Sequence, residues 1–274
     1  MKLNENIISD LRNTTPLVHC ITNYVTVNDC ANSLLAIGGS PIMADDEDEV
    51  EEIIAICNAL VINIGTLNKR TIKSMLKAGK KANKLGKAVV LDPVGAGASK
   101  LRTETALELL KEVKFTAIRG NISEIKTLAV GSGTTKGVDA ADSDAISEDN
   151  LAVNVALAQA LSEKTGAVIA ITGAIDIIAD SKKSCQIYNG HPIMSKITGT
   201  GCMCSAILGA FIAGAEDKFM ATAAAVAVMG LAGERAQHKL EANGLGTGSL
   251  RVGIIDELSL MNDEKLLEGA RLEA

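Results

Sequence analysis

The stretch ALVINIGTLNKRTIKSMLKAGKKANKLGKAVVLDP, residues Ala59 to Pro93, holds two short apolar runs separated by a lysine-rich segment. The runs ALVINIG and KAVVLDP are typical of buried strands, and the segment between them is long enough for a helix. A strand, a helix and a second strand in this order indicate two parallel strands joined by a helical crossover. The sequence therefore predicts an α/β protein with a parallel sheet.

The same alternation continues on both sides of this stretch. We expect strands over residues 16–21, 40–44, 115–120 and 167–173, and helices from about Val25 and over residues 46–57, 101–113, 121–130 and 151–164. Two apolar runs, 175–180 and 184–190, follow closely and favour an antiparallel edge on the same sheet. From Gly201 onward the pattern is almost entirely helical. Because no linker, repeat or boundary interrupts the chain, we predict one domain over residues 1–274.

The composition supports a globular protein and excludes one class of partner. With 274 residues, 47% of them hydrophobic, the chain can bury a full core. Aromatic residues are 2% of the chain and Trp is absent, so stacking on nucleobases is not expected. A net charge of -6 also lacks the basic face that nucleic acids require. Nucleic acid is therefore excluded as the main partner.

Three features predict a cytoplasmic protein without membrane association. Residues 1–20 lack the basic start and apolar core of a secretory signal. The six cysteines form no C-x-x-C pair and are expected to be free thiols in a reducing compartment. The longest apolar runs, on either side of Ala215–Lys218, are shorter than the roughly 18 residues of a membrane-spanning helix.

The helix expected after Tyr24 has an unusual polar side. A buried stripe is predicted at helical spacing by Val27, Cys30, Ala31, Leu34 and Leu35. The other side carries mainly uncharged amides and hydroxyls, in Asn28, Asp29, Asn32 and Ser33. Solvated helix faces usually carry Lys and Glu, so this side indicates a subunit contact or a pocket wall. The alternative is a polar surface that merely uses Asn.

Several predicted strands end in polar residues, at the edge where open α/β sheets bind ligands. Asp92 closes one strand beside two glycines, which suits a magnesium or water ligand, or an Asx turn that only ends the strand. Arg119 ends another strand, where a guanidinium can bind phosphate oxygens or pair with a surface acid. Thr172 offers a hydroxyl beside Gly173, although hairpin turns use the same residues.

The segment NISE that follows Arg119 has the spacing of a capping box. Asn121 can cap the next helix, and Glu124 stands three residues later. Helix capping alone would explain both residues, but it does not explain Arg119.

The segment KITGTGCMCSA, Lys196 to Ala206, is typical of an anion-binding turn that begins a helix. Gly199, Thr200 and Gly201 can aim successive backbone N–H groups at an anion, aided by the helix dipole. Such a turn would stabilise a phosphoryl group during transfer. The alternatives are a glycine-rich helix start with a buried cysteine, or Cys202 as a covalent nucleophile of lowered pKa with a histidine base. Cys204 is assigned to the core.

Five motifs in this order resemble the hydroxyethylthiazole kinase family of the ribokinase-like superfamily. They are PLVHCITNYVTVNDCANSLLAIGGSPIMA (16–44), DPVGAGA (92–98), IRGNISEI (118–125), ITGAID (171–176) and GTGC (199–202). The resemblance covers the chain from about Pro16 to the C-terminal helices, and the first and last motifs are specific to this family. It implies a ribokinase-like three-layer αβα sandwich with a mostly parallel sheet and an antiparallel edge.

The resemblance also implies an activity and a set of roles. The activity is ATP-dependent phosphorylation of the primary alcohol of 4-methyl-5-(2-hydroxyethyl)thiazole, a salvage step toward thiamine, in a homotrimer with sites between subunits. By family pattern, ATP is contacted by Arg119 and Thr172, and the thiazole by Met43 and Gly199. Mg²⁺ is held by Asp92 and Glu124. An anion hole is formed by Gly199, Thr200 and Gly201, and the catalytic-base position is taken by Cys202.

Cys202 stands where ribokinase-like relatives usually carry Asp. Phosphoryl transfer passes through a loose transition state, so early removal of the alcohol proton matters less than positioning and charge neutralisation. A thiolate with a pKa of about 8.5 or lower can accept that proton as transfer finishes.

Two other functions remain open from the residues. One is a kinase of the same fold that acts on another small alcohol, such as hydroxymethylpyrimidine, a pyridoxal-like ring or a sugar. The other is a non-catalytic nucleotide-binding trimer, which would not need two metal carboxylates and a base. The acidic stretch from Gly137 to Glu148 contains no motif that we can use.

Overall fold

The computed structural model describes residues 2–131 and 146–274, in which nine strands form a single sheet. The strands are β1 (Leu17–Ile21), β2 (Ser40–Ile42), β3 (Ala59–Asn63), β4 (Ala88–Asp92), β5 (Ala117–Gly120), β6 (Val168–Ile171), β7 (Asp176–Ala179), β8 (Ser184–Ile187) and β9 (Leu272–Glu273). Their order is β2-β1-β3-β4-β5-β6-β7-β8-β9. Strands β1 to β6 pair in parallel, and β7, β8 and β9 extend the sheet with antiparallel pairs.

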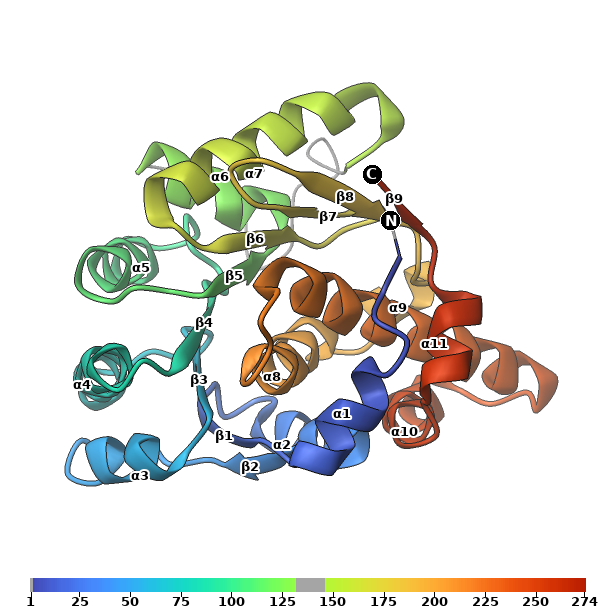
Figure 1. Cartoon of the computed structure of the whole chain (residues 1–274), viewed down its shortest axis with the longest axis horizontal. Helices are drawn as coiled ribbons and strands as arrows, with labels where there is room; N and C mark the ends of the chain where they lie inside the picture. The colour runs from blue at the N-terminus through green and yellow to red at the C-terminus, as the bar shows by residue number, and fades with distance from the viewer. Residues whose placement is uncertain (1, 132–145) are drawn as a thin grey trace.

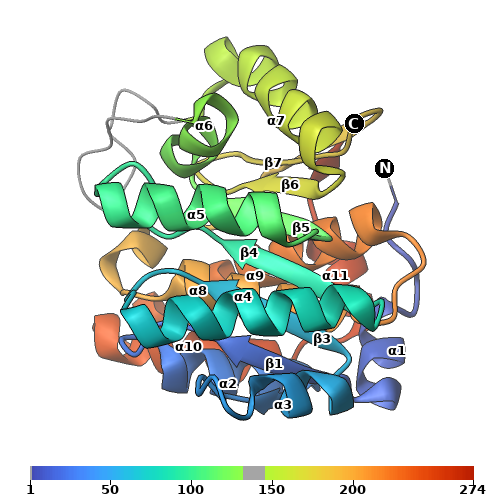
Figure 2. The same ribbon diagram turned by 90° about the vertical axis from the view of Figure 1, so that its left-hand side faces the viewer.

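Helices cover both faces of the sheet, which confirms the three-layer arrangement (Figure 1). One layer consists of α3 (Val50–Ile56), α4 (Lys69–Lys84), α5 (Lys100–Glu112), α6 (Ile122–Val130) and α7 (Leu151–Thr165), with α4 and α5 in front in Figure 2. The other includes α1 (Ile7–Thr14), α2 (Val27–Ile37), α8 (Thr200–Ile212), α9 (Lys218–Ala242), α10 (Thr247–Ser259) and α11 (Asp263–Gly269). Short 3-10 helices span η2 (Glu148–Asn150) and η3 (Pro192–Lys196).

The two faces of the sheet differ in the size of their side chains. Because neighbouring residues of a strand point to opposite faces, Leu60 and Ile62 of β3 pack in the core under α4, whereas Ala59 and Val61 face α8. The small side chains let α8 approach closely: a Cβ on Gly209 would lie 2.6 Å from Val61 Cγ2. This close packing fixes α8, and with it the turn at its start, against the sheet.

Most predicted elements are confirmed, with three differences. The sequence pattern did not indicate helix α1 or strand β9, which pairs with β8 after the C-terminal helices. The predicted stripe of α2 is also rotated. Leu35 is 57% exposed, whereas Ser33 and Asp29 are buried, because the buried side of α2 runs through Cys30, Leu34 and Ile37. Of the acidic stretch from Gly137 to Glu148, residues 137–145 lie outside the described residues.

Helix α9 corrects the expectation that no apolar segment is long enough to cross a membrane. Helix α9, Lys218–Ala242, is long and apolar enough to cross a membrane. However, 83% of its most apolar segment is buried inside the protein, as in the core helix of a globular fold.

Candidate active site

A cavity of about 850 Å³ opens at the carboxyl ends of the central parallel strands. Its walls include Asp92 at the end of β4, Arg119 in β5, Thr172 just after β6, Glu124 in α6 and the turn that begins α8, residues 199–202. The structure therefore brings together all of the predicted site residues except Met43. This is the position at which open α/β sheets place their ligands.

Met43 lies in a second, smaller cavity of about 110 Å³. Thr66 belongs to the walls of both cavities, so the two are neighbours. Cys20, Thr22 and Tyr24 line the smaller cavity beside Met43. Met43 and Gly199, which are expected to contact the same substrate, therefore line two adjoining cavities of this chain.

Asp92 and Arg119 form a buried ion pair at the base of the larger cavity. Arg119 Nη1 lies 3.8 Å from Asp92 Oδ1. Asp92 Oδ2 accepts hydrogen bonds of 2.8 Å from both Asn63 Nδ2 and Ser205 Oγ. Burial raises the pKa of Asp92, and the nearby guanidinium and these two donors offset that only in part. Asp92 is thus a carboxylate whose charge is incompletely compensated.

Each member of the pair keeps one unused polar atom. Among the described residues, Asp92 Oδ1 and Arg119 Nε are buried without a hydrogen-bond partner. Arg119 Nη2 donates to the hydroxyl of Thr172. Burial acts to lower the pKa of Arg119, but Asp92 and other neighbouring acids raise it above its ordinary value, so the guanidinium keeps its charge. Apart from the 3.8 Å ion pair, Asp92 Oδ1 therefore keeps capacity to accept a bond and Arg119 Nε keeps capacity to donate one.

Glu124 is held by the capping box that its spacing predicted. Its Oε2 accepts the backbone N–H of Asn121 at 2.8 Å, and Asn121 Oδ1 caps the Glu124 N–H. Its Oε1 accepts the Gly95 N–H, also at 2.8 Å, from the loop after Asp92. Burial and the nearby Asp92 raise the pKa of Glu124 to about 7, against the two backbone donors. Helix capping therefore explains the position of Glu124, but it explains neither the hydrogen bond from Gly95 N–H nor the proximity of Glu124 to Asp92.

The predicted anion-binding turn begins α8. Gly199 has φ of +94°, in the left-handed region that favours glycine, and a Cβ there would lie 2.7 Å from Thr26 Cγ2. The first bond of the helix runs from Met203 N–H to Gly199 O, so the N–H groups of Thr200, Gly201 and Cys202 precede the helical ladder. A Cβ on Gly201 would lie 2.4 Å from Arg119 Nη1. The guanidinium thus lies directly against this turn.

Cys202 is half-buried between two asparagines. Its sulfur accepts hydrogen bonds of 3.2 Å from Asn23 Nδ2 and from Asn63 Nδ2. Burial and the nearby Asp92 raise the pKa of the thiol, and hydrogen bonds from Thr26 and the two asparagines lower it only in part. The expected pKa of about 8.5 or lower is therefore wrong, because burial and the acidic neighbour outweigh the three hydrogen bonds to the sulfur.

The same geometry weakens the covalent-nucleophile alternative for Cys202. Among the described residues, no histidine forms a hydrogen bond with the sulfur: His19 binds Ala44 O at 2.8 Å, His191 Nδ1 accepts from Ile193 N–H, and His238 lies exposed on α9. Cys204 is buried in the core, as predicted, with burial raising the pKa of its thiol to about 12.

Three cavity residues, Asn23, Arg102 and Asp176, escaped the sequence prediction, and so did Asn63, which binds Cys202 and Asp92 beside the cavity. Asn63 closes its strand as Asp92 does, so the rule that found Asp92 would have found it. Asn23 follows β1 in the same way. Arg102 donates to Val94 O at 3.0 Å and Gly65 O at 2.6 Å, which ties together the loops after β3 and β4. Asp176 accepts the Gly173 N–H at 2.8 Å, and burial raises its pKa to about 7. No local pattern marks Arg102, and Asp176 ends the motif ITGAID, in which no role was assigned to it.

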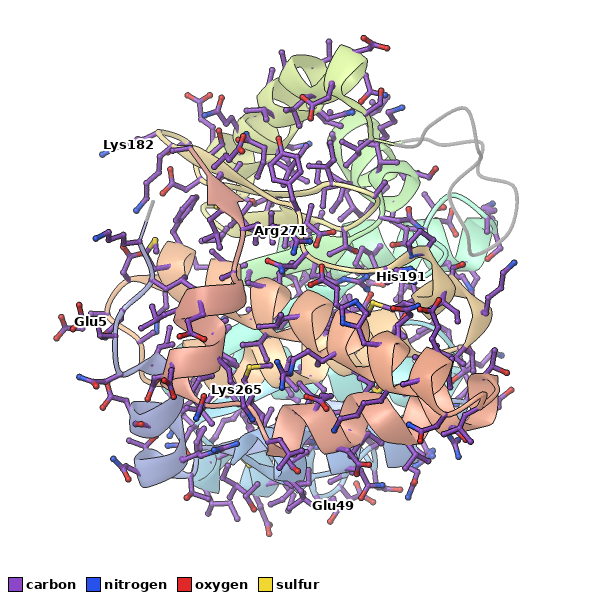
Figure 3. All side chains as sticks on the ribbon, turned by 90° about the vertical axis from the view of Figure 1, so that its right-hand side faces the viewer. Glu5, Glu49, Lys182, His191, Lys265 and Arg271 are labelled. Carbon is purple, nitrogen blue, oxygen red and sulfur yellow. The ribbon has the colours of Figure 1, made fainter. Side chains whose placement is uncertain are left out.

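The outer wall of the cavity is anchored to α9. Glu234 accepts the Gly190 N–H at 2.7 Å and also binds Arg271, which follows α11. His191 and Arg271 lie on the face that carries α9 in Figure 3. This anchoring fixes the segment from Asn189 to Met194 that closes one side of the cavity.

Comparisons with known proteins agree on one family. The model of the Hydroxyethylthiazole kinase family matches residues 8–264. A protein named hydroxyethylthiazole kinase from Clostridium acetobutylicum is 59% identical over 268 residues, which cover 97% of this chain and 98% of that one. The solved structure of a hydroxyethylthiazole kinase protein from Pyrococcus horikoshii OT3 is 38% identical, with a TM-score of 0.86 over 97% of this chain and 96% of its own. The fold is also that of a ribokinase-like superfamily protein from Enterococcus faecalis V583. That structure is 14% identical, with a TM-score of 0.65 over 97% of this chain and 96% of its own.

Proposed function

The chain belongs to the hydroxyethylthiazole kinase family, and on that basis we propose that its larger cavity transfers the γ-phosphoryl group of ATP to the hydroxyl of hydroxyethylthiazole. The observation that carries this proposal is the convergence of four features in one cavity. They are a charged guanidinium, two carboxylates, a helix N-terminus and a sulfur base. Phosphoryl transfer needs this combination of positioning and charge neutralisation.

In the proposed step, the alcohol oxygen forms a bond to the γ-phosphorus while the bond to the bridging oxygen of ADP breaks. The alcohol proton passes to Cys202 Sγ, and ADP leaves with the electron pair of the broken bond. The raised pKa of Cys202 makes its thiolate a stronger base, although a smaller fraction is ionised at neutral pH. Late proton transfer suits such a base, because the transition state carries little bond formation to the alcohol.

Arg119 and the turn of α8 would bind the charge that moves during transfer. The guanidinium of Arg119 lies against Gly201 through Nη1 and Nη2, and Thr172 accepts a hydrogen bond from Nη2. The leading N–H groups of α8 and its dipole provide further donors for phosphate oxygens. Donors fixed in this way need no reorganisation when the charge develops.

Asp92 and Glu124 fit a magnesium ion that accompanies ATP. Asp92 Oδ1 is a buried acceptor without a hydrogen-bond partner among the described residues, and the two carboxylates are close enough to raise the pKa of Glu124. Magnesium is usually held by one or two carboxylates together with phosphates and water. When bound, it would neutralise charge on the phosphates.

We also propose the homotrimer that the family pattern implies, with the thiazole site completed by a neighbouring subunit. Met43 lines only a small cavity, which one chain leaves beside the larger one. Large apolar side chains are exposed nearby: Tyr24, which lines the smaller cavity, is 79% exposed, and the adjacent Val25 is 56% exposed. Exposed apolar groups of this kind mark interaction surfaces when they cluster. Light scattering on the purified protein measures the assembly directly.

A cytoplasmic location is part of the proposal. All six cysteines are free thiols, and five of them are buried. Free thiols persist in a reducing compartment.

The test of this function is ADP release from magnesium-ATP by the purified protein with hydroxyethylthiazole, hydroxymethylpyrimidine or ribose. Release that depends on the thiazole supports the proposal. Release with hydroxymethylpyrimidine alone would keep the kinase and reject its substrate. No release with any of the three would favour the non-catalytic nucleotide-binding trimer.

A further inference from the structure

Two asparagine side chains converge on the sulfur of Cys202. Asn23 lies just after β1 and Asn63 ends β3, and both are buried. Each places its Nδ2 atom 3.2 Å from Cys202 Sγ. The sulfur, on the first turn of α8, is therefore bound by two amides from two different strand ends.

Hydrogen bonds to the backbone fix the orientation of both amides. Asn63 Oδ1 accepts the Gly65 N–H at 2.9 Å, and Asn23 Oδ1 accepts the Thr26 N–H at 3.2 Å. A backbone N–H can only donate, so in each amide the oxygen must face it and the NH₂ group must face the sulfur. Asn23 Nδ2 also donates to Asn63 Oδ1 at 3.1 Å, which joins the two amides.

The other groups around Cys202 act differently on its charge. Asp92 on β4 disfavours a thiolate, as does burial, and Cys30 on α2 lies near enough to interact. Arg119 on β5 attracts a thiolate, and Thr26 adds a hydrogen bond to the sulfur. The asparagine amides add two directed donors to this set.

We propose that Asn23 and Asn63 are positioning residues that stabilise Cys202 as a thiolate and hold its sulfur toward the turn of α8. Donors to a charged acceptor stabilise it more than donors to a neutral one. The pair would thus offset the effect of Asp92 and make the sulfur a usable proton acceptor. This inference rests on the proposed role of Cys202 in phosphoryl transfer.

Asn23 offers the cleaner test, because Asn63 also donates to Asp92. Asn23→Ala removes the donor, and Asn23→Asp keeps an acceptor for Thr26 N–H but replaces the NH₂ group with oxygen. The control is Asn243→Ala, at an exposed asparagine after α9. The first readout is alkylation of Cys202 by iodoacetamide from pH 6.5 to 10.5, quantified on its peptide by mass spectrometry, which requires no kinase activity.

Loss of one hydrogen bond to a charged group should raise the midpoint of the alkylation curve by about one pH unit. We expect this shift in both Asn23 variants and no shift in the control. An unchanged midpoint in folded Asn23→Ala and Asn23→Asp proteins would overturn the inference. The carboxylate of Asn23→Asp would raise the midpoint by its charge alone, so the neutral variants decide: if Asn23→Ala does not fold, Asn23→Leu, of similar size, takes its place.

The second readout is a double-mutant cycle on kcat. Asn23→Ala should lower kcat about tenfold in the wild-type background, with little change in the KM for ATP, and should have no further effect in the Cys202→Ala background. An equal effect in both backgrounds would mean that Asn23 acts on the fold rather than through the sulfur. If the wild-type protein has no thiazole-dependent activity, the proposed function fails, while the alkylation curves still decide whether the amides stabilise the thiolate.

Discussion

Gly201 leaves room for the guanidinium on which the site depends. A Cβ at this position would lie 2.4 Å from Arg119 Nη1 and 2.7 Å from Nη2, whereas ordinary contacts begin at 3.4 Å. In Gly201→Ala, Arg119 must therefore retreat by about 1 Å from the turn, and a misplacement of this size can cost about 10²-fold in rate. We expect kcat/KM for ATP to fall about 100-fold, or about 2.7 kcal/mol of transition-state stabilisation.

Stability should change little in Gly201→Ala, because terminal atoms of Arg119 can move and Ala favours a helix over Gly by about 1 kcal/mol. Gly79→Ala on α4 is the matched control: its Cβ would lie 2.6 Å from Val113 Cγ2 in the core, and neither residue lines the cavity. Core overpacking costs about 1–3 kcal/mol, so this variant should lose Tm but keep its kcat/KM. The assays are ADP release at varied ATP and thermal unfolding. Wild-type kcat/KM in Gly201→Ala would refute the proposed contact between Arg119 and the phosphates.

Three other outcomes follow from the site. Cys202→Ala should lower kcat by less than about 10³-fold, and Cys202→Asp should remain active in the same assay; a folded but inactive Asp variant would contradict the base role. Because the pKa of Glu124 is raised to about 7, its proton must leave before magnesium binds. Magnesium should therefore raise Tm more at pH 8 than at pH 6, and Glu124→Gln should abolish that difference. In the protein without magnesium, the raised pKa means that Glu124 keeps its proton to higher pH when folded than when unfolded. The free energy of unfolding should therefore fall as the pH rises from about 4.5 to 7. Denaturant titrations measure this fall, which should be less steep in Glu124→Gln.

The fold could be predicted because its signals are local. Apolar strand runs such as ALVINIG alternate with helical segments, and a parallel sheet covered by helices follows from that alternation. The elements that were missed depend on distant contacts. Strand β9 consists of two residues that pair with β8, and the buried side of α2 is set by its neighbours α8 and α10 rather than by its own spacing.

The candidate site was partly predictable for the same reason. Asp92, Arg119 and Thr172 end strands or directly follow one, and parallel strands bring such residues to one edge. The environment of Cys202 was not predictable, because its pKa depends on Asp92 and two asparagines from other strands. The sequence showed only the helix N-terminus, which lowers the pKa of a thiol, and not the burial and the carboxylate that raise it. Met43 likewise follows a strand end, but its strand lies at the edge of the sheet, so Met43 lines the smaller, neighbouring cavity instead.

The most direct test of the central claim is the stoichiometry of products. The purified protein, magnesium-ATP and hydroxyethylthiazole are incubated together, and ADP, free phosphate and phosphorylated thiazole are quantified by phosphorus NMR and mass spectrometry. Direct transfer in the cavity predicts one phosphorylated thiazole for each ADP, with no phosphate retained on the protein. ADP accompanied only by free phosphate, or phosphate found on Cys202, would contradict it.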